Sequence, residues 1–300
     1  MVEENSDGGI DSIIRYGGVT GARLEADSFA FGQGLTIAKT YAHLMAPFMM
    51  AFEPAQPGQH HPAPWVAVEG GLSFDIESEI FLPPDFNPPR WFSRGGTIWW
   101  ITTLLKLRAT ARLFTPVLSN ASFSRANTPD VNVRIWPMEV YTHRIALAPG
   151  SNNVVSLEAL EWIKRHWFDG GILALENHKF YLLVEALDKA AYAGSYSLAL
   201  LLIWAALESL FGTGRDELRF RISTFIACFL EPVRNIRRQL QRKVAGLYDA
   251  RSSVAHGRVL GELDPLHETY QLGRKVFLKI VEDNSVPDQD SLMGLLFGTG

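Results

Sequence analysis

Residues 243–257 read KVAGLYDARSSVAHG and contain the two residues on which the interpretation of this chain depends. Arg251 and His256 lie five positions apart, and Gly257 directly follows the histidine. Because glycine adopts the left-handed conformation at helix ends cheaply, we expect a helix from Pro232 to end here. On a continuous helix this spacing would set the two side chains about 140° apart. They can therefore converge only if the helix ends between them.

The chain around this stretch, from residue 151 onward, has the apolar spacing of amphipathic helices. Ser156 is a good N-cap, Asp169–Gly171 predicts an end to that first helix, and Asp264–Pro265 opens the last one. The segment 196–211 is apolar on every side, so we expect it at the centre of a bundle. The helices are predicted over residues 156–169, 174–193, 196–211, 217–231, 232–255 and 264–282.

The first half of the chain has a different composition, with short apolar runs interrupted by Gly and Pro. Turn residues this frequent exclude long helices, and the alternation of Leu72, Phe74 and Ile76 indicates a strand. One helix is predicted over 96–108 and further strands near 112–118 and 131–140, whereas residues 1–9 should be disordered and residues 56–64 a surface loop.

These patterns predict an α+β protein with a β-rich N-terminal domain followed by an all-α helical bundle. We expect the β-rich domain over residues 1–150, a linker helix over 151–171, the bundle over 172–283 and a flexible tail over 284–300. The N-terminal domain would be a sensor or regulatory part, with an unknown ligand or protein partner.

Charge is unevenly distributed along the 300 residues. The net charge is −4, but residues 215–258 hold ten Arg and Lys against four acids, so this segment carries +6 and the remainder −10. A basic region in an acidic protein is typical of phosphate binding, and solvated helix faces are the alternative. With a single cysteine, no signal peptide and no apolar run of membrane-spanning length, we expect a soluble, cytoplasmic protein with no membrane partner.

Most catalytic motifs are absent from the sequence, including the phosphate-binding loop, the dinucleotide fingerprint, the nucleophile elbow and the paired-histidine zinc motif. His60 and His61 are adjacent in a proline-rich loop without a cysteine cluster, which disfavours zinc. The aromatic residues Trp91, Trp99, Trp100 and Trp136 are expected in the core. We therefore predict no metal and no cofactor.

Arg251 and His256 together have the chemistry of a phosphate site. A guanidinium offers bidentate donors to phosphate oxygens, and an imidazole exchanges protons near neutral pH. Glu208 ends an otherwise apolar helix, so it should be partly buried, and we predict that it pairs with Arg251 and orients it. The alternatives are a structural salt bridge for Arg251 and a helix-capping role for His256.

The ordered set of residues resembles the Apea-like branch of the HEPN superfamily over residues 172–283. The pattern of that branch is W-x-x-L-E on one helix followed by Y-x-x-R-S-x-x-x-H-G. The matching positions are Trp204, Leu207, Glu208, Tyr248, Arg251, Ser252, His256 and Gly257. We find no such resemblance for residues 1–150.

The resemblance implies a metal-independent endoribonuclease, acting as a toxin or an antiviral (anti-phage) defence effector. Arg251 and His256 from two protomers of a homodimer would form a composite site that cleaves RNA through its own 2′-OH and leaves a cyclic phosphate. Arg251 would clamp the phosphate, and His256 would act as acid, base or phosphate contact. A helix C-terminus favours the imidazolium, which suits an acid better than a base.

The neighbouring residues have predicted roles and simpler alternatives. Tyr248 and Ser252 would line the pocket, with packing as the alternative for Tyr248. Arg258, Arg242 and Lys243 would follow the RNA backbone, or would be exposed solubilising charges. Other members of the superfamily have lost activity, so a non-catalytic module for dimerisation and for nucleotide or ligand binding is the second reading of the whole chain.

Overall fold

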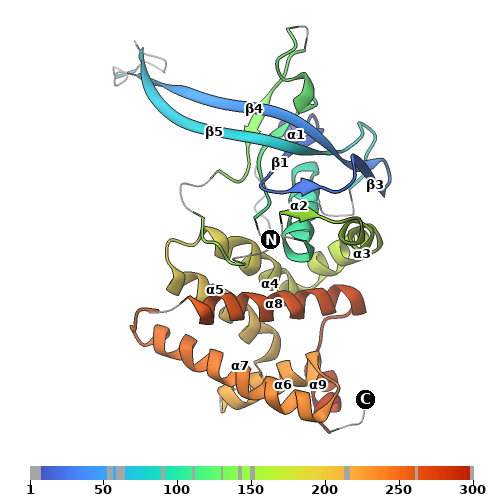
Figure 1. Ribbon diagram of the computed structural model, residues 1–300, viewed down its shortest axis with the longest axis vertical. Helices are drawn as coiled ribbons and strands as arrows, with labels where there is room; N and C mark the ends of the chain where they lie inside the picture. Colours follow the sequence, from blue (N-terminus) through green and yellow to red (C-terminus); the bar gives the residue numbers. More distant parts are fainter. Residues whose placement is uncertain are drawn as a thin grey trace.

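The computed structural model describes ten ranges of the chain, and every statement below about structure refers to them: 8–52, 57–58, 65–88, 92–109, 112–129, 131–140, 144–148, 153–212, 217–260 and 263–297. Most of the predicted loop over 56–64, with His60 and His61, lies outside these ranges, as do Trp91 and most of the predicted linker at 149–153. The chain runs from a sheet at one end of the molecule to helices at the other (Figure 1).

An antiparallel sheet forms most of the first half, in the strand order β3-β4-β5-β1-β6-β7. A short parallel pair joins β2 to β8. The strands are β1 (Tyr16–Thr20), β2 (Arg23–Leu24), β3 (Ser28–Gly32), β4 (Leu35–Phe52), β5 (Trp65–Phe81), β6 (Phe114–Ser119), β7 (Ile135–Pro137) and β8 (Val154–Val155). The alternation at Leu72, Phe74 and Ile76 falls within β5, as the sequence predicts.

The pair β4–β5 is much longer than the strands beside it. Its register runs from Thr36↔Phe81 to Phe52↔Trp65, whereas β3 and β1 pair only with the ends nearest the body. The distal part is therefore a two-stranded ribbon, and Figure 1 shows it extending away from the rest of the sheet. Met45 and Val66, one on each strand, are both exposed.

Helices make up the second half, and the first half also contains α1 and α2. The α-helices are α1 (Gly8–Asp11), α2 (Arg94–Arg108), α3 (Leu157–Glu176), α4 (His178–Lys189), α5 (Tyr196–Phe211), α6 (Leu218–Leu230), α7 (Arg234–Ala255), α8 (Asp264–Asp283) and α9 (Gln289–Phe297), and short 3-10 turns cover Phe123–Arg125 and Ala190–Tyr192. The predicted order of a sheet followed by helices is confirmed. The helix starts at Ser156 and Asp264 are also confirmed, because Ser156 caps α3 and α8 begins at Asp264.

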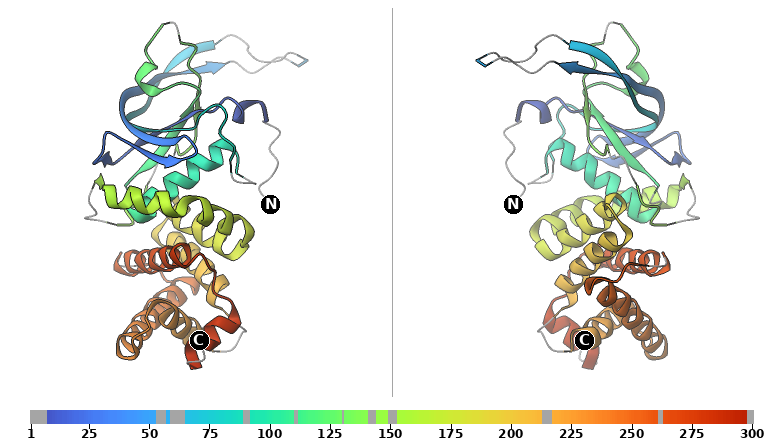
Figure 2. Two further views of the ribbon diagram at one scale, coloured as in Figure 1. Left: turned by 90° about the vertical axis from the view of Figure 1, so that its right-hand side faces the viewer. Right: turned by 90° about the vertical axis from the view of Figure 1, so that its left-hand side faces the viewer.

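The helix α2 joins the sheet to the helices. It lies between them in both side views (Figure 2), and its Trp100 is fully buried. The Trp100 indole donates a hydrogen bond to the carbonyl of Trp167 on α3 at 2.7 Å, and its ring packs edge-on against Phe277 on α8. Residues of the sheet and of the helices therefore share one continuous hydrophobic core.

The first helix of the second half is longer than predicted. Instead of ending at Asp169–Gly171, α3 continues to Glu176, and α4 starts at His178 rather than near residue 174. The two glycines serve packing, since a Cβ on Gly171 would lie 3.1 Å from the indole nitrogen of Trp100, and one on Gly170 would lie 3.5 Å from the same ring. The boundary between linker helix and bundle at residue 171 therefore falls inside a helix.

Both ends of the described chain are more ordered than predicted. Gly8 and Gly9 belong to α1, and the tail expected to be flexible contains α9, whose Leu292 is fully buried. The start of α9 is locally stabilised because the Asp288 carboxylate accepts a hydrogen bond from the Ser291 amide at 2.7 Å and the Ser291 hydroxyl accepts one from the Asp288 amide at 3.0 Å. Hydrogen bonds from the Ser291 amide and hydroxyl to the carboxylate lower the pKa of Asp288.

Only one side of α5 is buried. Trp204 and Leu207 are fully buried, whereas Tyr196, Leu198 and Leu202 are exposed. The prediction of a central helix is therefore wrong for that second side, although the helix spans the predicted residues. An exposed apolar side of this kind is typical of a surface that another chain covers.

Three charged residues are buried together where the sheet meets the helices. The Lys106 ammonium on α2 contacts Glu139, which follows β7, and lies 2.7 Å from Asp188 on α4. The Thr115 amide and the Trp99 indole donate to the two carboxylates at 2.7 and 3.0 Å. Burial by itself lowers the pKa of Lys106 and raises that of Asp188, but the opposite charges outweigh it and shift both pKa values the other way.

Candidate phosphate-binding site at the end of α7

Glu208 on α5 and Arg251 on α7 form an ion pair, as the sequence predicts. The Arg251 Nη2 donates to Oε2 at 3.0 Å, and its Nε lies 2.9 Å from Oε1. Both side chains are largely buried, with 25% of Arg251 and 20% of Glu208 exposed. A carboxylate at the end of an apolar helix requires such a cation, and the pair fixes the guanidinium relative to α5.

Tyr248 completes this cluster from one turn earlier on α7. Its hydroxyl is near enough to the Glu208 carboxyl to lower the pKa of that group, and the Arg251 guanidinium lies 5.6 Å from its ring centre. The ring is buried and packs edge-on against Trp204 at 5.3 Å. The packing interpretation of Tyr248 is therefore correct, and the same residue also holds Glu208 in place.

The electrostatics of Glu208 reflect its position. Burial raises the pKa of the carboxyl, while the charge of Arg251 and the hydrogen bond from Tyr248 lower it, and the net pKa is raised. Burial therefore outweighs Arg251 and Tyr248, which reduce the rise in the pKa of Glu208 without reversing it. Removing either partner would leave a buried charge without compensation.

The helix ends where Gly257 predicts. Gly257 has a φ of +87° and its amide donates to the Val254 carbonyl, while the Arg258 amide donates to the Ser253 carbonyl. These two bonds form a Schellman motif, with glycine at the position that needs a left-handed backbone. The cap residue His256 therefore departs from the helix direction, with φ −92° and ψ 19°, and it is exposed.

His256 stands apart from the pair within one chain. Among the described residues, its side chain makes no hydrogen bond, ion pair or ring contact with Arg251 or Glu208. The structure thus brings Glu208, Arg251 and Tyr248 together and leaves His256 in solvent just beyond the last turn of the same helix. Ser252, directly after Arg251, is half-buried, and its carbonyl accepts the His256 amide at 3.1 Å.

The three predicted backbone-contacting residues lie in different places. Arg258 is exposed beside His256. Arg242 and Lys243 are also exposed, but eight or nine residues separate them from Arg251, about 12 Å along the helix at ~1.5 Å per residue. Lys243 already pairs with Glu268 on α8 at 2.9 Å, so part of its charge is compensated.

Two features near this site do not follow from the motif. The first half of α7 carries an exposed basic ridge, Arg234, Arg238 and Arg242, at intervals of four residues and without an ion-pair partner among the described residues. This ridge could have been found in the sequence, because residues four apart on a helix lie on the same face. The second feature is a groove between α7 and α8, which depends on residues from three segments and has no sequence signal of its own.

No helix in the described ranges has the length and apolar character needed to cross a membrane. Over the same residues, no group of three or more histidine, cysteine or carboxylate side chains is arranged to hold a metal ion. Comparisons with protein-family models, with curated proteins and with solved structures find no match for this chain. A function therefore has to be derived from the residues of the chain itself.

Proposed function

We propose that this protein is a metal-independent endoribonuclease of the HEPN type. Arg251 and His256 act on the scissile phosphate, and Glu208 orients Arg251. The observation that carries the proposal is the fixed guanidinium at the end of α7, followed one turn later by an exposed histidine. The resemblance of the sequence around these residues to Apea-like HEPN proteins supports the same reaction.

Arg251 retains donors for a phosphate while it is bound to Glu208. A guanidinium has five N–H groups, and Glu208 faces the edge formed by Nε and Nη2. The two N–H groups of Nη1 and one of Nη2 are left on the other edge. A quarter of the side chain is exposed, so this edge can contact a phosphate oxygen and stabilise the charge that develops on it.

In this reaction the 2′ oxygen attacks phosphorus and the bond to the 5′ oxygen breaks. One proton leaves the 2′-OH and another arrives on the 5′ oxygen, so the products are a cyclic phosphate and a free 5′-OH. His256 suits the second transfer, because the carbonyls at a helix C-terminus stabilise an imidazolium. No metal is required for either transfer.

The surface around the site supports binding of a polyanion and assembly of a dimer. The ridge Arg234, Arg238 and Arg242 would contact successive phosphates along α7. The exposed side of α5, which includes Leu198 and Leu202, continues toward Glu208 at the end of the same helix. A second copy that covered this side would bring a second His256 toward the Arg251–Glu208 pair.

The test compares RNA cleavage in EDTA by the wild type, Arg251→Ala and His256→Ala. Both variants should lose cleavage by about 100-fold or more, the usual contribution of an acid, base or oxyanion contact, while circular dichroism and thermal unfolding show a folded protein. Arg219→Ala and His178→Ala are matched controls, since each removes the same side chain from an exposed position outside the site. Cleavage that survives in both site variants would refute the proposal.

Mixing the two inactive variants tests the composite arrangement. If Arg251 and His256 of one site come from different protomers, a heterodimer contains one intact site and cleavage partly returns. If both come from the same protomer, mixing restores nothing.

One observation favours a second function. The exposed apolar side of α5 suits dimerisation whether or not the chain cleaves RNA, and His256 makes no contact with Arg251 within one chain. A non-catalytic dimerisation and ligand-binding module would form the dimer, bind RNA or a nucleotide through the basic ridge, and give the same RNA pattern with wild type and His256→Ala.

A further inference from the structure

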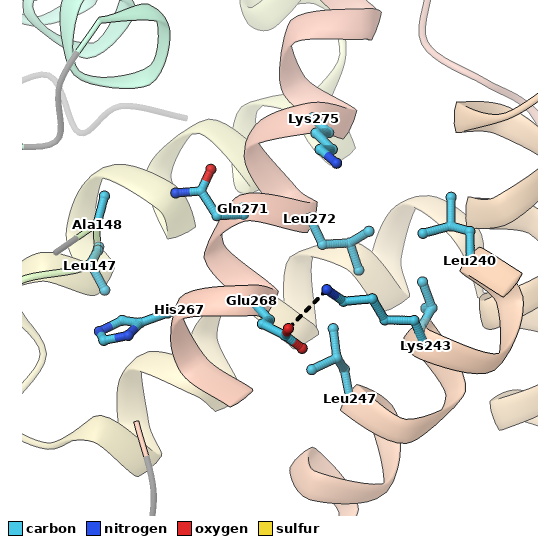
Figure 3. A pocket seen from close by; sticks show the side chains of 11 residues that line it. Leu147, Ala148, Leu240, Lys243, Leu247, His267, Glu268, Gln271, Leu272 and Lys275 are labelled. Atoms are coloured by element: carbon cyan, nitrogen blue, oxygen red, sulfur yellow. Dashed lines mark hydrogen bonds and ion pairs between the residues drawn. The ribbon is translucent and has the colours of Figure 1, made fainter. Parts of the chain in front are cut away.

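A groove between α7 and α8 lies about two turns before Arg251 on α7, next to residues 147–148 (Figure 3). It encloses about 600 Å³, which is within the range of small-molecule sites in proteins. The residues that line it are Leu147, Ala148, Leu240, Lys243, Val244, Leu247, His267, Glu268, Gln271, Leu272 and Lys275.

One wall of the groove is apolar. Leu240, Val244 and Leu247 line the groove from α7 at helical spacing. Figure 3 shows Leu272 of α8 on the side that faces Leu240 and Leu247. Val244, Leu247 and Leu272 are buried by their neighbours, while the groove itself stays open to solvent. Leu240 is only half-buried, and more of the groove's accessible surface is apolar than polar, so covering the groove with an apolar body removes apolar surface from water.

The opposite wall is a polar ridge along α8, formed by His267, Gln271 and Lys275 at intervals of four residues. The orientation of His267 is fixed because its Nε2 lies 3.0 Å from the Ala146 carbonyl and must donate to it. The Gln271 side-chain oxygen accepts from Arg274, which leaves its amide N–H groups available as donors.

The charges of the groove do not cancel. Lys243 and Glu268 face each other across it at 2.9 Å and neutralise one another (Figure 3). Lys275 has no ion-pair partner among the described residues, and the neighbouring Arg274 is engaged with the carbonyls of Leu107 and Arg108. One positive charge, that of Lys275, therefore remains at one end of the groove.

We propose that this groove binds a small amphipathic organic anion, a carboxylate with an extended apolar body. The body would lie along Leu240, Val244 and Leu247, and the carboxylate would contact Lys275. The size, the single apolar wall and the single uncompensated cation each select for this class of ligand. The groove is separate from the proposed catalytic residues, because none of Glu208, Arg251 and His256 lines it, and it shares only Lys243 with the predicted RNA-contacting residues.

The first test uses the fluorescent aromatic anion anilinonaphthalene sulfonate with the full-length protein. Decanoate should displace it, whereas decanol and decyltrimethylammonium, which share the alkyl chain, should do so at least several-fold less well. The three competitors have alkyl chains of similar length and head groups of different charge, so the order of their affinities reports the sign of the charge that the groove prefers. Equal competition by the neutral or the cationic compound would overturn the proposal, as would a failure of decanoate to compete.

Two substitutions with opposite effects locate the site. Lys275→Gln removes the uncompensated charge and should weaken decanoate binding about 2–5-fold, the usual value for one exposed charge contact. Glu268→Gln frees Lys243 and should strengthen binding by a similar factor. Lys279→Gln is the matched control, because Lys279 lies one turn further along α8, pairs with Asp283 and does not line the groove.

Circular dichroism and thermal unfolding confirm that all three variants are folded. If Lys275→Gln and Glu268→Gln bind decanoate as the control does, the anion lies elsewhere and the assignment of this groove is wrong. If both substitutions shift affinity in the same direction, charge does not select the ligand, and the proposal fails on its chemistry.

Discussion

The guanidinium of Arg251 lies edge to edge with the carboxylate of Glu208, joining the last turns of α7 to the end of α5 across 43 residues of sequence. A second arginine–carboxylate pair joins α6 to α7, where Arg219 donates two hydrogen bonds to Asp249 at 2.6 and 2.7 Å. The two pairs differ in burial, since both side chains of the second pair are about half exposed. This difference separates a positioned guanidinium from a surface ion pair.

Glu208→Gln should therefore destabilise the protein by about 1.5–3 kcal/mol, the value of a hydrogen bond to a charged group. It leaves Arg251 partly buried without a counter-charge. The free energy of unfolding in urea measures the effect. The matched variant Asp249→Asn should leave that free energy unchanged within error, because water already solvates both partners. Equal effects of the two substitutions would show that the burial of the first pair has no energetic consequence.

Gly257→Ala should destabilise the protein by about 1–2 kcal/mol, because alanine pays a steric penalty at a φ of +87°. Its Cβ would meet no other atom, so the effect is one of backbone conformation alone. Gly246→Ala is the same substitution inside the same helix, also without a clash. It should stabilise by about 0.5–1 kcal/mol. Gly257→Ala should therefore lower the melting temperature and Gly246→Ala should raise it. A shift in the same direction for both variants would contradict the assigned helix end.

Lys106→Met should destabilise the protein by about 3–5 kcal/mol, because it leaves Glu139 and Asp188 buried without a cation. Lys39→Met, which removes an exposed lysine paired with Asp27, is the control and should leave the urea midpoint unchanged. A small effect of Lys106→Met would mean that water reaches the three buried groups in solution.

The pH dependence gives a second test of the same cluster. The lowered pKa of Asp188 contributes stability that is present above its unfolded value of 3.8 and is lost as the pH falls through the folded value. Without Lys106, burial would dominate and raise the pKa of Asp188 above its unfolded value. Lowering the pH would then stabilise the folded protein instead of destabilising it. Lys106→Met should therefore gain stability when the pH is lowered from about 8 to about 5, whereas the wild type should not.

The sequence predicts the parts of this fold that depend on local signals. Ser156, the Asp264–Pro265 pair and Gly257 mark helix ends through their own backbone preferences, and the structure uses each of them. The Glu208–Arg251 pair was also predictable, because a lone carboxylate on an apolar helix needs a cation and the motif supplies one.

Other features depend on contacts between distant segments. Gly170 and Gly171 predict a helix end locally, but they admit the Trp100 indole from α2. Lys106 lies 33 residues before Glu139 and 82 residues before Asp188 in the sequence. Nothing in the sequence shows that these three residues meet. The lone lysine in the apolar helix over 94–108 was the only local signal.

The core shared through Trp100 also limits how such a chain can be rearranged. An exchange of the sheet half between two related proteins would place an unrelated surface against α3 and α8, where Trp100 now contacts Trp167 and Phe277. In a folded chimera, α2, the two glycines of α3 and the side of α8 that faces them would all have to come from the same parent protein. The two halves are therefore not interchangeable as separate units.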